Sequence, residues 1–356
     1  MQPREVDYTE LFSSERRWRD KQPYLQSRGY MLRPRLRPGW VPSWTSTGED
    51  PLDCEDGIRL PARAHLVDAT RMSDGKLVYV KRIKTGDQES SIASVLSSEP
   101  LRKDPRNHTV PVEDVFVDDE DPSTSYLVMP FLRRPTSPPF EYVGEVVDFV
   151  DQVLEGLTFM HDQGVAHRDC AMPNIMMDAS ALFPDGFHPI KQYSLPHDIR
   201  KESKWLPRMH AGVRYYFVDY GISSYFPPGQ PRERVTGILG REQAVPELSN
   251  TKPYDPFAVD VCIIGNLLHA EFLKQYSNVS FLQRLATEAT RRNPEDRPDA
   301  AALLRLWTVE RRRVSAVHKS WRLHDRGESL VETAARDCFG LIGSAWGYAG
   351  SVLGWK

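Results

Sequence analysis

The residues best suited to chemistry lie in the stretch GVAHRDCAMPN, residues 164–174. Asp169 precedes Asn174 there, and another acidic residue, Asp219, follows in the segment YYFVDYG. A carboxylate can orient and deprotonate a hydroxyl, whereas carboxylate and amide oxygens are ligands that suit Mg²⁺. These groups indicate phosphoryl transfer, which requires an orienting base, a metal and a fixed cation on the phosphates.

A candidate for the fixed cation is Lys81, in the strand-like segment KLVYVKRI. Glu89 begins the segment ESSIASVL, in which Ile92 and Leu96 share one helical face and Asp87 is a plausible N-cap. That face turns Glu89 toward the strand. A Lys81–Glu89 pair would hold the ammonium group on the phosphates.

The surrounding elements predict an α+β fold. Residues 63–84 predict a hairpin with its turn at 73–75, and residues 109–117 and 125–132 predict two more strands. Residues 145–164 form the clearest amphipathic helix, and the pattern after residue 141 is mostly helical. A small strand-rich part followed by a larger helical part would position the candidate residues.

In this order and spacing, the motifs resemble those of a eukaryotic protein kinase domain, from about residue 60 to 305. VYVK resembles the lysine motif of the third strand, HRDCAMPN the catalytic loop, DYG the metal-binding motif and VPE the end of the activation segment. Arg297 is then the expected partner of Glu247, and DVCIIG with Asp260 and Gly265 resembles the central helix of the C-lobe. The chain is also similar to fungal kinase-like proteins with an HRDC loop and an N-terminal LRPR/RPGW arm.

The resemblance implies a two-lobed protein kinase-like fold, with a small β-rich N-lobe and a larger helical C-lobe. The predicted parts are an N-terminal arm over 1–60, the N-lobe over 61–131, the C-lobe over 132–310 and a C-terminal extension over 311–356. It implies ATP and Mg²⁺ as cofactors. The residues implied for catalysis are Asp169, Lys81, Asn174 and Arg168. Those implied for ATP binding are Lys81, Glu89, Tyr79 and the hinge residues Met129 (the gatekeeper), Pro130, Phe131 and Leu132. Those implied for metal binding are Asp219 and Asn174.

Structural interpretations compete with these roles. Loop carboxylates and amides such as Asp169 and Asn174 often cap turns, and a single strand lysine is more often a surface residue. His167 is interpreted as a packing and hydrogen-bonding residue rather than a proton carrier. Cys170 is interpreted as a small apolar filler, with a reactive thiol as the alternative.

Several positions depart from the kinase pattern. LPARAHLVDA, where the resemblance places a glycine-rich phosphate loop, contains no glycine, and Cβ atoms there obstruct a close approach of the backbone to phosphates. Tyr79 stands where the family has a small alanine above adenine. Ala171 and Pro173 replace the additional cations of serine/threonine and tyrosine kinases, respectively.

Three further segments lie outside the motifs. The proline-rich region around LRPRLRPGWVPSW predicts an extended arm, either a strap packed on its own domain or a docking segment anchored by Trp40 and Trp44. Residues 180–212 are an insertion between two strands. The aromatic residues of this insertion indicate an ordered flap packed on its own lobe, and the alternative is a partner-binding surface. The uncharged tail 339–355 suggests membrane contact, but docking on the lobe or a partner is favoured because its glycines weaken a spanning helix.

The composition of the 356-residue chain does not indicate a particular class of binding partner. A net charge of −3 with 27% charged residues argues against a nucleic-acid partner, and four scattered cysteines predict neither a zinc site nor a disulfide framework. A cytoplasmic location is expected, with the nucleus as the alternative. The predicted function is an ATP- and Mg²⁺-dependent kinase acting on a protein hydroxyl; the alternatives are a pseudokinase scaffold and a small-molecule phosphotransferase.

Overall fold

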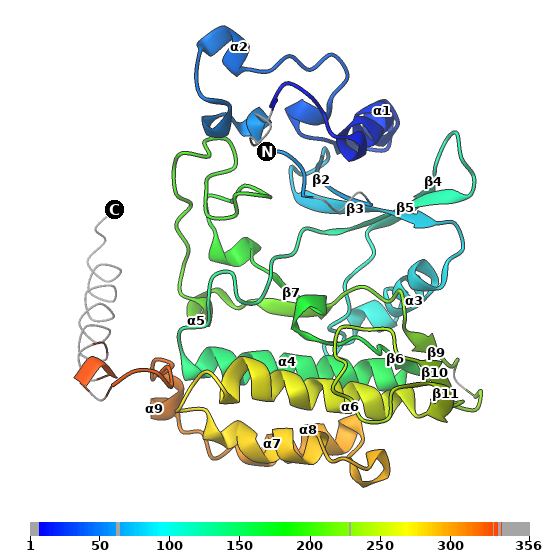
Figure 1. Cartoon of the computed structure of the whole chain (residues 1–356), viewed down its shortest axis with the longest axis vertical. Coiled ribbons are helices and arrows are strands. Elements are labelled where there is room, and N and C mark those ends of the chain that lie inside the picture. Colours follow the sequence, from blue (N-terminus) through cyan, green and yellow to red (C-terminus); the bar gives the residue numbers. More distant parts are fainter. Residues whose placement is uncertain (1–6, 62–64, 228, 330, 334–335, 337–356) are drawn as a thin grey trace, which may run out of the picture. The chain divides into compact units, whose positions relative to one another are not determined.

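The structure is a computed structural model that describes residues 7–61, 65–227, 229–329, 331–333 and 336. It divides into two compact units (Figure 1). Unit 1 comprises Met1–Arg102, Val110–Arg133 and Met177–Arg214, and unit 2 comprises Lys103–Thr109, Arg134–Met176 and Tyr215–Lys356. An antiparallel sheet combined with many helices confirms the predicted α+β class, consistent with a two-lobed kinase-like fold.

Unit 1 is built on a five-stranded antiparallel sheet with the strand order β1-β2-β3-β5-β4. Its strands are β1 (Tyr30–Met31), β2 (Leu66–Arg71), β3 (Leu77–Lys84), β4 (Asp114–Val117) and β5 (Thr124–Pro130). The predicted hairpin is confirmed as β2 and β3, whose turn contains Gly75 at a φ of 72°. Asp87 caps α3 (Gln88–Leu96) by accepting the Ser90 N–H at 2.8 Å, which confirms the predicted cap.

The prediction of an extended N-terminal arm is wrong for residues 13–27, which form helix α1 (Ser13–Ser27). The prolines that exclude a helix lie later, at 34–42, and do not affect this segment. Trp18, Gln22 and Leu25 recur at helical spacing and are buried on one face of α1. The Glu15 carboxylate accepts the Phe12 N–H at 2.9 Å and so closes the first turn.

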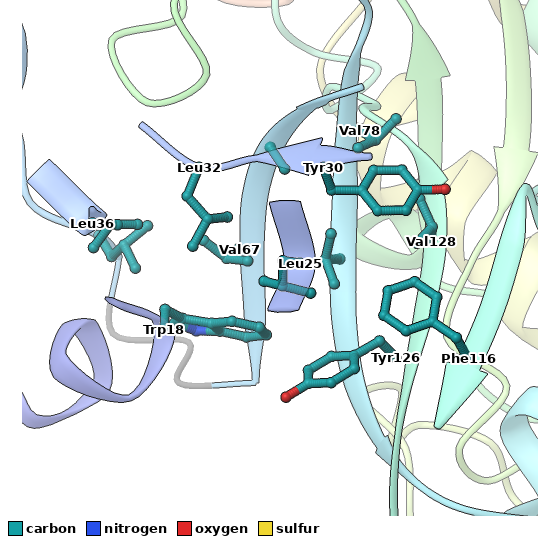
Figure 2. Packing of buried hydrophobic residues seen from close by; sticks show 13 residues of the cluster. Trp18, Leu25, Tyr30, Leu32, Leu36, Val67, Val78, Phe116, Tyr126 and Val128 are labelled. Atoms are coloured by element: carbon teal, nitrogen blue, oxygen red, sulfur yellow. The ribbon is translucent and has the colours of Figure 1, made fainter. Parts of the chain in front are cut away.

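The arm packs on the sheet of unit 1, which confirms the interpretation of a strap on its own domain. Figure 2 shows side chains of α1 and β1 beside those of the sheet strands. The Tyr30 ring stacks on the Phe116 ring with centroids 5.9 Å apart, and the ring centroids of Trp18 and Tyr126 are 6.1 Å apart. Trp40 donates its Nε1–H to Asp56 at 2.9 Å, so this tryptophan also has a partner within its own unit.

The insertion also belongs to unit 1, in which it is ordered. It begins after β7 (Ile175–Asp178) and contains α5 (Arg208–Ala211) before β8 (Arg214–Phe217). The buried Arg133 guanidinium lies over the rings of Phe183 and Phe187, at 4.3 and 4.6 Å from their centroids. The insertion is thus an ordered flap, but it packs within unit 1, whereas the prediction placed it on the C-lobe.

Unit 2 is mainly helical. The predicted amphipathic helix is α4 (Val143–Asp162), which packs against α8 (Ala300–Arg311) and α9 (Ala316–Lys319), while α6 (Pro256–Leu267) packs against α7 (Gln283–Ala289). Gly265 on α6 faces α7 so closely that an added Cβ would lie 2.7 Å from Ala289 Cβ. Pro256–Leu273 has the length and apolarity of a membrane span, but 72% of it is buried within the fold, as in a core helix.

Short strand pairs and helices complete the structure. The remaining elements are α2 (Trp44–Thr47), β6 (Val165–Ala166), β9 (Ser224–Tyr225), β10 (Val235–Gly237) and β11 (Ser249–Tyr254). They form the pairs β6–β9 and β10–β11, and β7 pairs with β8. The predicted apolar tail over 339–355 lies outside the described residues.

Candidate functional site

The first group of candidate residues lies in unit 1, on β3 and α3. Lys81 Nζ forms an ion pair with Glu89 Oε1, and each side chain is 13% exposed. In the sheet register, Lys81 lies opposite Leu66 on β2 and Leu127 on β5. The structure therefore brings the predicted cation on β3 and its carboxylate on α3 together, and this ion pair holds the Lys81 ammonium in place.

Tyr79 lies two residues before Lys81 on β3, so the two side chains leave the same face of the sheet. The Tyr79 ring stacks on Phe131, with centroids 4.3 Å apart and an interplanar angle of 23°. Tyr79 is opposite the hinge residue Met129 in the register, and Pro130 is opposite Val78. Leu132, the last of the predicted hinge residues, is buried. Two stacked rings thus occupy the part of unit 1 that the kinase resemblance assigns to adenine.

The face that carries Lys81 also carries an ion pair that the sequence did not reveal. The strand beside β2 is β1 in the arm, and the chain leaves β1 through Leu32 and Arg33. Arg33 Nε donates to Asp68 Oδ2 at 2.8 Å, and Asp68 is opposite Tyr79 in the register. Arg33, which follows β1, and the buried Asp68 of β2 thus place a guanidinium and a carboxylate on this face.

The second group lies in unit 2, where Asp260 organises the HRD loop. The fully buried Asp260 carboxylate on α6 accepts the His167 N–H at 2.7 Å and the Arg168 N–H at 2.6 Å. Arg168 has a φ of 65°, a left-handed conformation that costs a non-glycine residue free energy and needs such support. Burial lowers the pKa of His167 and raises the pKa of Cys170 well above its usual value, which favours structural roles for both.

The Asp169 carboxylate is held by hydrogen bonds at both oxygens. Asn174 Nδ2 donates to Asp169 Oδ2 at 2.7 Å and to the Asp169 carbonyl at 2.9 Å. The Arg241 N–H donates to Asp169 Oδ1 at 2.7 Å, and Arg241 Nε lies 4.0 Å from Oδ2. Because the Asn174 nitrogen faces Asp169, its amide oxygen remains as the acceptor that a metal would use.

Asp219 follows β8 and is linked to Asn174 through the backbone. The Val218 N–H donates to the Asn174 carbonyl at 3.0 Å, which aligns the two segments, and the next residue is the exposed Asp219. Asp219 has a φ of 70°, the other non-glycine residue of the described chain with a positive φ. Strained residues concentrate at functional sites, and an exposed carboxylate is a ligand type that suits Mg²⁺.

The side chain of Arg168 fixes the segment that follows Asp219. Its guanidinium donates to the carbonyls of Ile222 and Thr236, at 3.2 and 3.1 Å, and to the Tyr254 hydroxyl at 2.9 Å. Among the hydroxyls of this segment, Ser223 is buried and donates to the His167 carbonyl, whereas Thr236 is exposed. Arg168 thus acts as a positioning residue in this structure.

The end of this segment is anchored as the resemblance implied. Arg297 Nη2 donates to Glu247 Oε2 at 2.9 Å, and the Arg297 side chain is fully buried. Arg297 also donates to the carbonyls of Ala258 and Arg291. A buried bidentate pair of this kind fixes the segment to unit 2.

Another cluster of acidic residues in the described chain does not offer a vacant metal site. Asp118, Asp119 and Glu120 lie close enough to share an ion, but Lys21 Nζ contacts all three at 2.8, 3.1 and 2.6 Å. These contacts attach α1 to the loop between β4 and β5. The cluster therefore has a structural role, since it holds α1 against this loop.

The order of motifs and the α+β architecture are consistent with a two-lobed protein kinase-like fold. No family model matches the chain. Serine/threonine-protein kinase ppk8 of Schizosaccharomyces pombe is 30% identical over 115 residues, which cover 31% of this chain and 16% of that protein. NUAK family SNF1-like kinase 2 of Rattus norvegicus is 24% identical over 214 residues, 57% of this chain and 28% of that protein.

These similarities support a protein kinase-like relationship, in agreement with the motifs. The chain spans less than a third of the length of either of these two relatives. The roles of the individual site residues remain predictions.

Proposed function

We propose that the chain is an ATP- and Mg²⁺-dependent protein kinase that transfers the γ-phosphate of ATP to a protein hydroxyl. The proposal rests on the arrangement in unit 2. There the Asn174 side chain is hydrogen-bonded to Asp169, and the Asn174 carbonyl accepts the N–H of Val218, the residue before Asp219. The Lys81–Glu89 pair of unit 1 supports it. The names of the two curated relatives agree with this class of activity.

In the proposed mechanism, Asp169 orients the attacking hydroxyl and accepts its proton. Asn174 Oδ1 and the Asp219 carboxylate would hold Mg²⁺, which would neutralise charge on the phosphates. Lys81, fixed by Glu89, binds phosphate oxygens. The Glu247–Arg297 anchor favours a protein substrate over a small molecule, because it fixes the segment that would form a platform for a polypeptide.

A nucleotide titration tests this proposal through Asp219. In Asp219→Ala, the affinity for ATP in the presence of Mg²⁺ should fall by at least about tenfold, because the metal loses a charged ligand. The binding of ATP without Mg²⁺ should change little. The measurement is a calorimetric titration at several magnesium concentrations, with Asp148→Ala on the exposed face of α4 as the matched control.

Wild-type protein that binds no nucleotide at any magnesium concentration would refute the kinase proposal. The second candidate function, a pseudokinase scaffold, would then stand. Two observations favour that candidate: the Tyr79–Phe131 stack and the buried Arg33–Asp68 pair occupy the sheet face that carries Lys81.

Replacing Tyr79 distinguishes the two candidates further. In Tyr79→Ala, the affinity for nucleotide should rise by about tenfold, since removing the ring opens volume on the sheet face beside Lys81. Nucleotide affinity can be measured by titration after a thermal transition has shown that the variant is folded. Tyr193→Ala, which removes an exposed ring of the insertion, is the control. An unchanged or weaker affinity in folded Tyr79→Ala would show that Tyr79 does not obstruct the nucleotide.

A further inference from the structure

Unit 1 contains a cavity of about 930 Å³ that is lined entirely by its own residues. Its walls come from three places: the arm, the sheet and the insertion. The lining does not include Lys81, Glu89, Tyr79 or Met129, so the cavity is separate from most of the predicted nucleotide residues. Its volume lies within the range of about 300–1,000 Å³ that is typical of small-molecule sites.

One wall of the cavity is aromatic. Phe131, Phe183 and Phe187 line it and are buried. Phe187 lies between the other two, with centroids 5.7 Å from Phe131 and 5.1 Å from Phe183. Prolines from the arm, the hinge and the insertion also line the cavity. This lining suits a flat apolar ring system.

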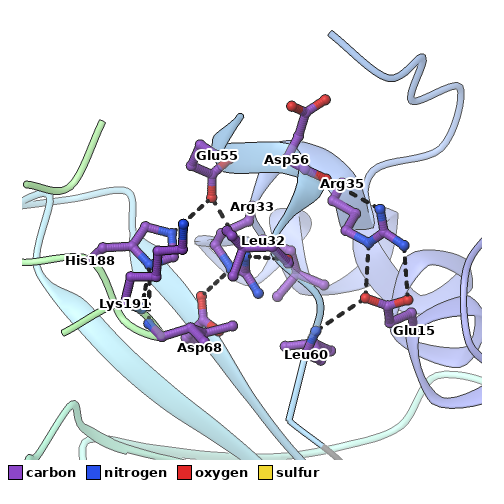
Figure 3. Close-up of polar contacts among 12 residues, drawn as sticks. Glu15, Leu32, Arg33, Arg35, Glu55, Asp56, Leu60, Asp68, His188 and Lys191 are labelled. Atoms are coloured by element: carbon purple, nitrogen blue, oxygen red, sulfur yellow. Dashed lines mark hydrogen bonds and ion pairs between the residues drawn. The ribbon is translucent and has the colours of Figure 1, made fainter. Parts of the chain in front are cut away.

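A buried polar network joins the arm to the insertion at the cavity (Figure 3). His188 Nδ1 accepts the N–H groups of Ile190 and Lys191, so its Nε2–H donates to Glu55 Oε1 at 3.3 Å. Glu55 also lies 3.5 Å from Arg33 Nη1. Burial raises the pKa of Glu55, but the bonds from His188 and the charge of Arg33 outweigh burial and hold this pKa below its usual value.

Arg33 carries a donor that the described chain does not satisfy. The side chain is 9% exposed, and its Nε and Nη1 donate to Asp68 and to the Ile58 carbonyl. Its Nη2 is buried and has no hydrogen-bond partner in the described part of the chain. An unpaired buried donor is unfavourable, so an occupant with an acceptor atom would gain affinity here.

The charges around the cavity indicate what kind of occupant it fits. Arg33 is balanced by Asp68 and Glu55, and Arg71 by Glu113 and Asp74. Arg37 also lines the cavity and is exposed, and its Nε donates to the Leu32 carbonyl. Among the described residues, no carboxylate lies within ion-pair distance of Arg37. Lys76 also lines the cavity, 4.0 Å from Asp74, and Asp178 accepts the Ser180 N–H. Among the described lining residues, Arg37 is therefore the guanidinium without an ion pair, and it suits a carboxylate or phosphate group.

We propose that this cavity is a small-molecule site for a flat aromatic compound that bears one carboxylate or phosphate group. The rings lie against Phe131, Phe183 and Phe187, and the anionic group pairs with Arg37. The site shares Pro130 and Phe131 with the residues predicted for ATP, does not include Lys81, Glu89 or Tyr79, and does not depend on kinase activity.

Three naphthalene probes test the site in the full chain. 2-Naphthoate and 2-naphthyl phosphate carry the two kinds of anionic group, and 2-naphthalenemethanol is the neutral control. Calorimetry on wild-type protein should show one-to-one binding, at least about tenfold tighter for an anionic probe than for the alcohol. The better of the two anions identifies the group that the natural occupant carries.

Two variants locate the binding. Arg37→Ala should lower the affinity for the anionic probe by about tenfold and leave the affinity for the alcohol unchanged. Arg312→Ala, which removes an exposed arginine of unit 2, should change neither affinity. Thr70→Phe places a ring into the cavity from β2, where aromatic residues are well tolerated, and should abolish the binding of all probes. A thermal transition confirms that each variant is folded.

Three results would overturn the proposal. The first is an absence of saturable binding of any probe to the wild type. The second is unchanged binding in Arg37→Ala and Thr70→Phe. The third is competitive displacement of the bound probe by ATP with Mg²⁺, which would make the cavity part of the nucleotide site. Loss of nucleotide binding in Asp219→Ala would leave probe binding intact, so the two proposals fail separately.

Discussion

Asp169→Asn is expected to lower the rate of phosphate transfer by about 10²–10⁴-fold, because the side chain keeps its size but loses the carboxylate that accepts the proton. Nucleotide binding should change little, since Asp169 is proposed to contact the hydroxyl and Asp219 the metal. The measurement is a single-turnover transfer assay beside a titration of ATP with Mg²⁺. The two readouts separate chemistry from binding.

Asp148→Asn is the matched control for this variant, because it makes the same chemical change on the exposed face of α4. It should transfer phosphate as fast as the wild type. If Asp169→Asn is also as fast as an active wild type, Asp169 is not the proton acceptor, and the catalytic interpretation of the HRD loop is wrong.

The largest expected effect on stability comes from Glu15. Both Glu15 and Arg35 are fully buried, and the Glu15 carboxylate accepts bonds from Arg35 Nε at 2.9 Å and from the Leu60 N–H at 3.1 Å (Figure 3). Removing one partner leaves the other charge buried and unpaired, so Glu15→Ala should lower the free energy of unfolding by about 3–5 kcal/mol. Urea denaturation measures this difference.

Two controls identify the cause of that loss. The double variant Glu15→Met with Arg35→Met should recover much of the stability, because it removes both charges and keeps apolar volume. Arg200→Ala removes an exposed partner of Glu49 and should cost less than about 1 kcal/mol. A loss below 1 kcal/mol in Glu15→Ala would show that the pair does not hold the arm.

The same pair predicts a dependence of stability on pH. Burial raises the pKa of Glu15, but the bonds from Arg35 and from the backbone outweigh burial, and the net pKa is lowered. A carboxyl group with a lowered pKa in the folded state stabilises the protein fully above its unfolded pKa. That stabilisation is lost as the pH falls toward the folded pKa, and Glu15→Ala should abolish this part of the acid sensitivity.

Residues close together in the sequence could be predicted as neighbours from local pattern, whereas a distant pair such as Glu247 and Arg297 was predicted only through the family resemblance. The hairpin of β2 and β3, helix α4 and the Lys81–Glu89 pair follow from local periodicity and turn residues. Helix α1 was missed because Gln22 interrupts its buried apolar face and proline dominates the later arm. The two-residue strand β1 is too short to leave a periodic signal.

The contacts that most change the interpretation of the site depend on tertiary packing. Arg33 reaches Asp68 only because the arm adds β1 to the sheet, and many charged residues could have been its partner from sequence alone. The bond from Arg241 to Asp169 joins residues far apart in the chain. Local sequence spacing predicts which side chains could take part in chemistry, but it does not predict which tertiary contacts those side chains make.

The contact between Arg241 and Asp169 joins the proposed catalytic carboxylate to the segment that follows Asp219. The Arg241 N–H donates to Asp169 Oδ1 and Asn174 Nδ2 donates to Oδ2, so each oxygen keeps a lone pair for a further donor. Under the proposed function, a state in which residues near Arg241 have withdrawn would leave Oδ1 more open to a substrate hydroxyl. A polypeptide that binds such a state more tightly would increase its fraction, so the substrate would then contribute to switching the kinase on.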